Sequence, residues 1–450
     1  SVTLTRLSAG DWGGIGFDAA LKASGSATAP MLTGSGRVRV ASASAPALAG
    51  LSDLLETPPD WRSFLGRLAP LEALVDLGPG DGEGAQVLTA GGALGAARLD
   101  LRAELDGGLA ALKTAALRLT ASLESDDSAG LTQQLGLGDD PLFEQEAMLV
   151  SLRLEGVPGN SLASRITLSA GDESLGFAGD LVATDGGEIQ GTGTLDVALA
   201  NAGGLAQIVG APGLSLPQAQ ASAGVHFEGG RMLRLTEIAG TSGDTGFSGA
   251  LALARTRDSA AVTGELAVDT ISVEGLATTL FGRAGMVAGS GGWPEGPISI
   301  GNQPRLTRGS VGVTAKALAA GGSTRLGATA FDLVWDESRV RLAQFEAAIG
   351  TGAAKLDMTV CCAGPLADKT VSGRVSLSAA AISAIAPPAV AASLAGRLEG
   401  GVQFDGTGAS LAEVIRTLAG EGNFTLADFS VDQLAPSVFQ TLAGLEDVLH

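Results

Sequence analysis

The chain is 450 residues long with a formal net charge of −20, and 45 % of its residues are apolar while only 4 % are aromatic. The apolar fraction excludes general disorder, and the length exceeds one compact core, so we expect several domains or an elongated repeat array. An acidic chain without a basic stripe is repelled by phosphate backbones, so we expect no nucleic acid among its partners.

The 67 glycines indicate the class of secondary structure. Glycine in a helix interior costs about 1 kcal/mol relative to alanine, so this density favours many short strands joined by tight turns. We therefore predict a mainly β fold. It is an elongated repeat of antiparallel amphipathic strands that form an open curved sheet, a half-pipe groove, with short connecting α-helices.

One order of features recurs along the chain: strand, turn, strand and a short helical patch. It spans residues 16–51, 176–210, 246–282 and 352–385, and a shortened form covers 422–439. The second and third copies are offset by 70 residues. A glycine- and alanine-rich composition alone does not explain four copies in the same order, so we expect one structural unit used repeatedly.

Three segments carry helical signals. Residues 61–77 have apolar residues at helical spacing, with a break expected at Pro70. Ser410 and Glu413 form a capping-box pattern, and Gly420 supplies a stop for that helix. A third helix is expected to begin near Pro436.

Loops at 77–84 and around Trp293 suggest where the chain divides. We predict β-rich repeat units in residues 1–140, with a helical insertion near 51–77. Two β repeat units follow in 141–290, and a C-terminal region occupies 291–450.

Two hairpins provide candidate residues for an apolar groove, one at 225–238 with a turn at Gly229-Gly230 and one at 331–349. In both, apolar residues alternate with polar ones, the period of a strand with one dry face. Burial under a helix would produce the same pattern. The residues expected to line the groove are Val225, Phe227, Phe331, Leu333 and Trp335.

Catalytic and metal-binding residues are not expected. His226 lies between apolar neighbours in a strand, where a structural role is commoner than a catalytic one, and no G-x-S-x-G motif occurs. Cys361 and Cys362 lack the spacing of a zinc site, and bridging adjacent cysteines strains the ring they form. We predict a protein that is not an enzyme and uses no metal or cofactor.

Acidic residues in turn-like surroundings are expected to be solvated charges. They form the pairs Asp126-Asp127 and Asp139-Asp140. The loop at 76–83 alternates acidic residues with glycine, but it lacks the ligand spacing of an EF-hand.

The C-terminal third resembles the AsmA-like proteins of Gram-negative envelopes. The resemblance rests on residues 394–434, where a strand ends in Gly406-x-Gly408 and a short amphipathic helix starts at Ser410. The segment Leu418-Ala419-Gly420-x-Gly422 and another strand follow. Residues 331–357 fit the family's alternation of strand and small-residue turn, and the rest of the chain fits more loosely.

The resemblance implies a periplasmic body of repeated β units, anchored to the inner membrane through a segment outside this sequence. It also implies kinship with bridge-like lipid-transfer proteins, in which phospholipid acyl chains slide on an apolar floor. We therefore expect a non-enzymatic envelope protein that handles phospholipid between inner and outer membranes and supports outer-membrane biogenesis. Its partners would be acyl chains and an outer-membrane protein of unknown identity.

The alternative is a secreted or surface β-solenoid, an adhesin-like structural protein. Solenoid rungs run to about 20–30 residues, shorter than the repeat seen here. A grooved cross-section would favour the lipid-handling function, and a solid rod would favour the solenoid.

Overall fold

The computed structural model describes residues 2–431, except 13–14, 27–28, 55–58, 113, 138–141, 144–146, 185–187, 202–217, 257–258, 283, 290–291, 299–306, 322–323, 362–368 and 386–392. The chain divides into two compact units, Ser1–Asp258 and Ser259–His450, each described below by itself. The boundaries expected after residues 140 and 290 fall inside unit 1 and unit 2, respectively.

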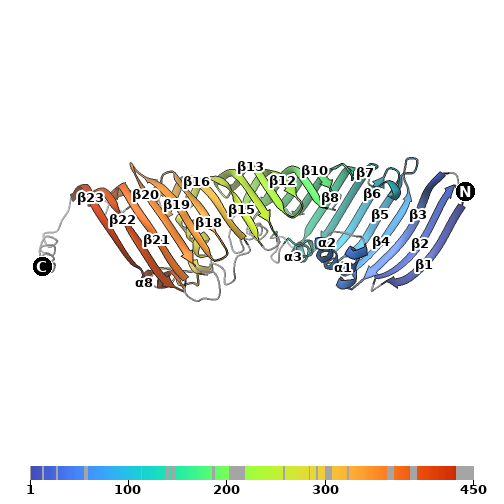
Figure 1. Ribbon diagram of the computed structural model, residues 1–450, viewed down its shortest axis with the longest axis horizontal. Helices are drawn as coiled ribbons and strands as arrows, with labels where there is room; N and C mark the ends of the chain where they lie inside the picture. The colour runs from blue at the N-terminus through green and yellow to red at the C-terminus, as the bar shows by residue number, and fades with distance from the viewer. Residues whose placement is uncertain are drawn as a thin grey trace. The chain divides into compact units, whose positions relative to one another are not determined.

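Unit 1 is an antiparallel meander in which each strand pairs with the next along the chain, from β1 to β14. Figure 1 shows these strands in blue to green. None of the described pairings joins β1 to β14, so the sheet is open. The strands are β1 (Val2–Trp12), β2 (Ile15–Ser26), β3 (Ala29–Ser42), β4 (Leu71–Pro79), β5 (Gln86–Leu94), β6 (Ala97–Leu105), β7 (Leu117–Ser125), β8 (Met148–Val157), β9 (Ser161–Ala170), β10 (Glu173–Ala183), β11 (Ile189–Leu199), β12 (Ala219–Glu228), β13 (Met232–Ser242) and β14 (Thr245–Arg255).

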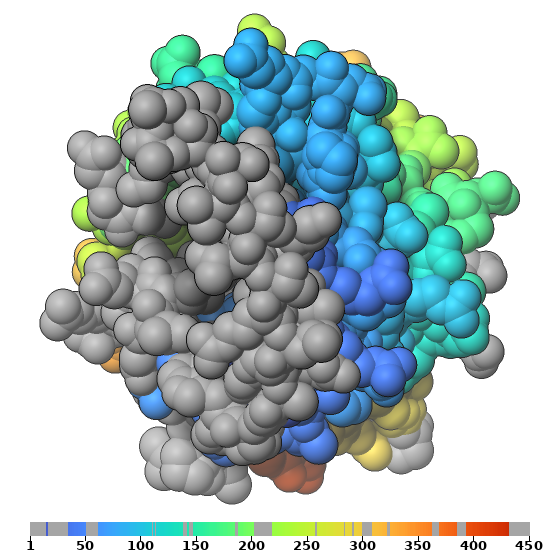
Figure 2. Space-filling model, turned by 90° about the vertical axis from the view of Figure 1, so that its right-hand side faces the viewer, coloured from blue at the N-terminus to red at the C-terminus, as the bar shows by residue number. Residues whose placement is uncertain are grey.

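Short helices interrupt this meander between strands. Helices α1 (Ala45–Leu54) and α2 (Pro59–Arg67) follow β3, the 3-10 turn η1 (Leu109–Ala111) follows β6, and α3 (Ser128–Leu135) follows β7. Figure 2 shows the space-filling surface with described residues of unit 1 in blue and cyan.

Unit 2 begins with a parallel pair, β15 and β16, and continues as an antiparallel meander from β16 through β18 to β23. A parallel pair needs a long crossover connection, and the segment that contains α5 supplies it. The strands are β15 (Ala260–Ser272), β16 (Thr307–Gly321), β17 (Thr324–Leu326), β18 (Thr329–Trp335), β19 (Arg339–Ile349), β20 (Gly352–Cys361), β21 (Lys369–Ala381), β22 (Leu394–Gly408) and β23 (Ala419–Val431).

The helical elements described in unit 2 are short. They are α5 (Val273–Phe281), the 3-10 turn η2 (Ala284–Met286), α6 (Ile382–Ile385) and α8 (Leu411–Arg416). The expectation of a mainly β fold with an open sheet and short helices is thus confirmed; among the described strand pairings, β15 with β16 departs from it by being parallel.

The predicted order of strand, strand and short helix appears in three of the copies. Residues 16–51 form β2, β3 and the start of α1, residues 246–282 form β14, β15 and α5, and residues 352–385 form β20, β21 and α6. The helical patch of the copy at 176–210 falls largely on residues outside the described ones.

Two expected helices differ from the structure. In 61–77, α2 ends at Arg67 and β4 occupies Leu71–Pro79, because Pro70 interrupts the helix and the residues after it alternate as in a strand. Helix α8 ends at Arg416, so Gly420 lies in β23 rather than at the helix terminus. The helix expected near Pro436 lies outside the described residues.

Among the described strands, four contain a bulge built on a non-glycine residue with positive φ. These residues are Glu237, Gln344, Ala379 and Asp428, with φ between 47° and 53°. Each lies at a shift in strand register. In β19, Val340 and Leu342 are buried before the bulge, and Phe345, Ala347 and Ile349 after it. The bulge adds one extra residue to β19. The even-numbered apolar residues before it and the odd-numbered ones after it therefore face the same side of the sheet.

The second recurring feature is an aromatic ring lying over a glycine of the neighbouring strand. The pairs are Gly191 with Phe227, Gly309 with Trp335, Gly373 with Phe404 and Gly400 with Phe424. A Cβ atom at Gly191 would come within 2.5 Å of the Phe227 ring, and one at Gly373 within 2.8 Å of the Phe404 ring. The missing Cβ of these glycines lets the rings approach the neighbouring strand closely, and such glycine–aromatic pairs help to fix strand register.

We predict that Gln344→Val destabilises the protein by about 1–2 kcal/mol, because a β-branched residue is strained at the left-handed conformation of this bulge. Unfolding by urea, followed by circular dichroism, measures the effect. Gln344→Gly removes the strain and should leave stability near the parent value. Glu346→Val, on the same exposed face of β19, is the control for loss of a polar side chain. Equal stability of Gln344→Val and Glu346→Val would contradict the role of the bulge.

Candidate functional site: the apolar faces of the two units

The register of unit 1 aligns apolar residues in rows that cross the strands. One row runs from β3 to β12 with every neighbour directly paired. Its members are Val38, Val75, Ala90, Leu101, Ala121, Leu152, Ile166, Phe177, Leu195 and Ala223. Because side chains alternate between the two faces of a sheet, all of them lie on one face, which we call the floor of unit 1.

The opposite face of unit 1 is polar and carries ion pairs between neighbouring strands. Arg37 and Asp76 are 2.6 Å apart, and Arg118 lies 3.5 Å from Glu104 and 3.6 Å from Glu155. All of these side chains are exposed, so the pairs contribute little to stability. They mark this face as solvated surface.

Helix α3 covers one end of the floor of unit 1. Leu131 of α3 is fully buried in a cluster with Met148, Val150 and Leu168 at the ends of β8 and β9. Gln134 fastens the helix, because its side chain accepts a hydrogen bond from Ala96 N and donates one to Leu94 O, both 2.9 Å.

The middle of the floor is less covered than this end. Leu101, Leu152, Phe177 and Leu195 remain half-buried, although they lie at the centres of their strands. A sheet packed beneath a second layer buries such residues fully. The floor of unit 1 is therefore an apolar surface that solvent still reaches.

Unit 2 has the same arrangement. One row crosses β16 and β18–β23 with every neighbour directly paired. It consists of Val311, Leu333, Leu342, Met358, Gly373, Phe404 and Gly420. A parallel row follows Phe345, Leu356, Val375 and Val402. We call this face the floor of unit 2.

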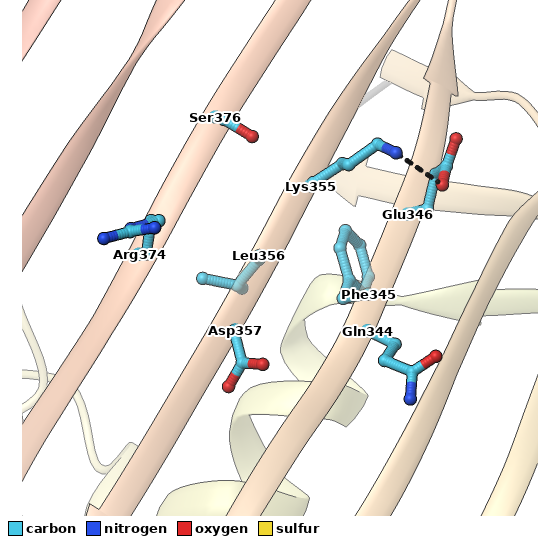
Figure 3. Close-up of a pocket in the computed structure, with 8 residues that line it drawn as sticks. All are labelled: Gln344, Phe345, Glu346, Lys355, Leu356, Asp357, Arg374 and Ser376. Atoms are coloured by element: carbon cyan, nitrogen blue, oxygen red, sulfur yellow. Dashed lines mark ion pairs between the residues drawn. The ribbon is translucent and has the colours of Figure 1, made fainter.

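The opposite face of unit 2 carries charges. Charged side chains of β19, β20 and β21 line a hollow of about 360 Å³. Figure 3 labels Glu346, Lys355, Asp357 and Arg374 among them. Lys355 lies 3.2 Å from Glu346, and Arg341 donates two hydrogen bonds to Asp357. The hydrogen bond from Arg341 lowers the pKa of Asp357 despite its partial burial. Glu346, Lys355 and Asp357 of this lining are ion-paired, and Phe345 and Leu356 also contribute to it.

All five residues expected to line a groove lie on these apolar faces. Val225 is buried, and Phe227 is half-buried with its ring 6.0 Å edge-on from Phe177. Phe331 is buried and its ring stacks on Phe345 at 6.1 Å. Leu333 and Trp335 pack against the same core cluster. Lining of a groove by these side chains stays a prediction.

Sequence reasoning missed most of both floors. The row in β6–β9 consists of leucine, alanine and isoleucine in strands such as LRLTASLES (Leu117–Ser125), whose alternation was a usable signal. The helix residues Leu280 and Phe281 of α5 and Val414 of α8 complete the core of unit 2, and their partners become visible only in three dimensions.

The titratable candidates have structural partners. His226 lies on the polar face, with Nδ1 3.0 Å from Thr192 Oγ1 and Nε2 3.2 Å from Glu228 Oε1. Asp127 caps α3 by accepting a hydrogen bond from Gly130 N. Within the described ranges, no three His, Cys, Asp or Glu side chains gather as metal ligands. Asp139 and Asp140 lie outside them.

Cys361 ends β20 and is disulfide-bonded, whereas the strain of a ring between adjacent cysteines had predicted no bridge. In this state its sulfur is not a thiolate ligand.

Among the described helices, none has the length and apolarity needed to span a bilayer. Comparisons with protein families, curated proteins and solved structures found no match to the chain.

We predict that Gln134→Ala lowers stability by about 1–3 kcal/mol, because it removes both hydrogen bonds that hold α3 to the β5–β6 turn. Hydrogen exchange of α3 should accelerate at the same time. Gln133→Ala is the matched control, since Gln133 is exposed on the same helix. If Gln134→Ala and Gln133→Ala have the same unfolding temperature, the hydrogen bonds of Gln134 do not stabilise the position of α3.

Proposed function

We propose that this is an AsmA-like cell-envelope protein, not an enzyme, that carries phospholipid between inner and outer membranes in support of outer-membrane biogenesis. The observation that carries the proposal is the floor of unit 1, a row of apolar residues paired directly across ten strands. Acyl chains would lie on this floor and on that of unit 2. The periplasm as location and an outer-membrane protein as partner belong to the same proposal.

Hydrocarbon suits such a floor better than a polar ligand. The backbone groups of the strands are engaged in the sheet ladder, and the floor side chains offer few hydrogen-bonding groups. Burial of each methylene contributes about 0.8 kcal/mol without any specific contact. A floor of this kind can therefore hold an acyl chain while leaving the head group in water.

The regular rows also suit movement. Neighbouring strands are about 4.8 Å apart, so a chain displaced by one strand meets a similar set of apolar groups. Binding energies at successive positions should therefore be similar, and barriers between them low. The net charge of −20 repels anionic membrane surfaces, which supports recognition through the acyl chains rather than through anionic head groups.

The pattern of strand pairing does not favour the β-solenoid alternative. Solenoid rungs stack equivalent strands in parallel. The described pairs of successive strands are antiparallel in both units, with β15 and β16 as the exception.

The proposal predicts contact between phospholipid and the floor. A photo-crosslinking residue replacing Leu152, on the floor, should label phospholipid in Gram-negative cells that express the chain. The same residue replacing Ser151, its neighbour on the polar face, should not. Mass spectrometry of the labelled protein identifies the adduct. Absence of lipid adducts at position 152, or equal labelling at positions 151 and 152, would contradict the proposal.

A charge on the floor should reduce lipid binding. Leu152→Glu places an ionised carboxylate where acyl chains lie, so protein purified in mild detergent should carry several-fold less phospholipid. Ser151→Glu adds the same charge to the opposite face and should retain the parent amount. Circular dichroism of both variants checks that the fold is intact. Parent protein that carries no phospholipid would count against the function itself.

A further inference from the structure

We infer that α5 seals the floor of unit 2 over β19, so that the acyl-binding part of this unit is β20–β22. The inference rests on the proposed function and names where in unit 2 the lipid binds. It concerns unit 2 alone.

The floor residues of β19 are buried along the whole strand. Their exposed fractions are 5 % for Val340, 2 % for Leu342, 8 % for Phe345, 0 % for Ala347 and 2 % for Ile349. The polar face of the same strand stays exposed, as at Arg341 and Glu346. The burial is therefore one-sided, and an element on the floor side must cover the strand.

Helix α5 is one part of that cover, together with Ile298 of the following segment and Val414 of α8, which are buried in the same cluster. It contacts β15, β16 and β19, and its Leu280 and Phe281 are buried in one cluster with Phe331, Leu342 and Phe345. Of the nine residues of α5 only these two are buried, both at its C-terminal end. Leu276 and Ala277 of the same helix also pack against this cluster and are half-buried. We call α5 in this position the plug.

The next three strands are covered differently. Val360 and Val371, at one end of β20 and β21, are buried in the same cluster with Val414 of α8. Beyond them, Leu356, Met358, Val375, Leu377 and Val402 are only half-buried. The change in burial falls between direct neighbours: Leu342 is buried and its partner Met358 is half-buried, and the same holds for Phe345 and Leu356.

The occupant that fits β20–β22 is an acyl chain rather than a peptide. These strands are internal to the sheet, and both of their edges are paired. Added peptide strands bind at free sheet edges through backbone hydrogen bonds, which this surface does not offer. Its exposed part consists of aliphatic side chains, the Phe404 ring and glycines.

The test places an aliphatic diazirine amino acid at Met358 or at Leu342 in the full chain. Each protein is then irradiated with vesicles of phosphatidylethanolamine and phosphatidylglycerol. Met358 should label acyl chains, and Leu342 should label roughly tenfold less, because lipid reaches it only after a local opening. Equal labelling at the two positions would overturn the inference.

Phe281→Ala tests the plug directly. Removing this ring should raise labelling at Leu342 several-fold and leave labelling at Met358 unchanged. Val273→Ala, at an exposed position of α5, is the control and should change neither. A Phe281→Ala protein that remains folded without increased labelling at Leu342 would show that α5 is not the plug.

The two proposals can fail separately. Labelling at Leu152 of unit 1 without labelling at Met358 contradicts the site on β20–β22 and leaves lipid handling standing. Labelling at none of the three positions contradicts lipid handling itself.

Discussion

The whole structure depends on strand register, because side-chain parity decides which face of the sheet is dry. A slip of one residue would move every apolar side chain of a strand to the charged face. Turns set the register at hairpins. Where the alternation of apolar residues shifts by one position within a strand, a bulge keeps them on the same face. At Gln344 the backbone accepts an unfavourable φ, and the five floor residues of β19 then remain on one side. Glycine–aromatic pairs such as Gly191 with Phe227 add a second constraint on register.

Much of the fold follows from local signals. The alternation of apolar and polar residues in 331–349 and the diglycine turn at 229–230 predicted the two hairpins correctly. The recurring order of strand, strand and short helix predicted β20, β21 and α6. The spacing of apolar residues gave a wrong prediction for the second half of 61–77, because it fits both a helix and a strand. The helix ends before Pro70, and a strand follows it. The parallel pairing of β15 with β16 was not predictable, because it joins strands separated by a crossover of more than thirty residues.

The candidate site was predictable in part. All five residues chosen for the groove lie on apolar faces, since aromatic and β-branched residues in alternation identify a dry face. The same pattern cannot distinguish an open floor from a covered one. Phe331 lies in a core cluster with Leu280 and Phe281, whereas Phe227 remains half-buried. That difference is tertiary, because it depends on whether a helix distant in sequence packs on the strand.

Partial cover also limits how much continuous apolar surface each floor presents. Soluble proteins rarely expose continuous apolar surface beyond a few hundred Å² unless something binds there. In unit 1, α3 covers one end of the floor, and the middle of that floor stays half-buried. In unit 2, α5 and α8 contribute buried residues to the core cluster on the floor side. Polar ligands gain little from such a surface, and a rigid protein partner would need a complementary ridge along many strands. A flexible hydrocarbon chain needs no polar contacts and no ridge of fixed shape to bury apolar surface here. This supports an acyl chain as the proposed occupant of the floor.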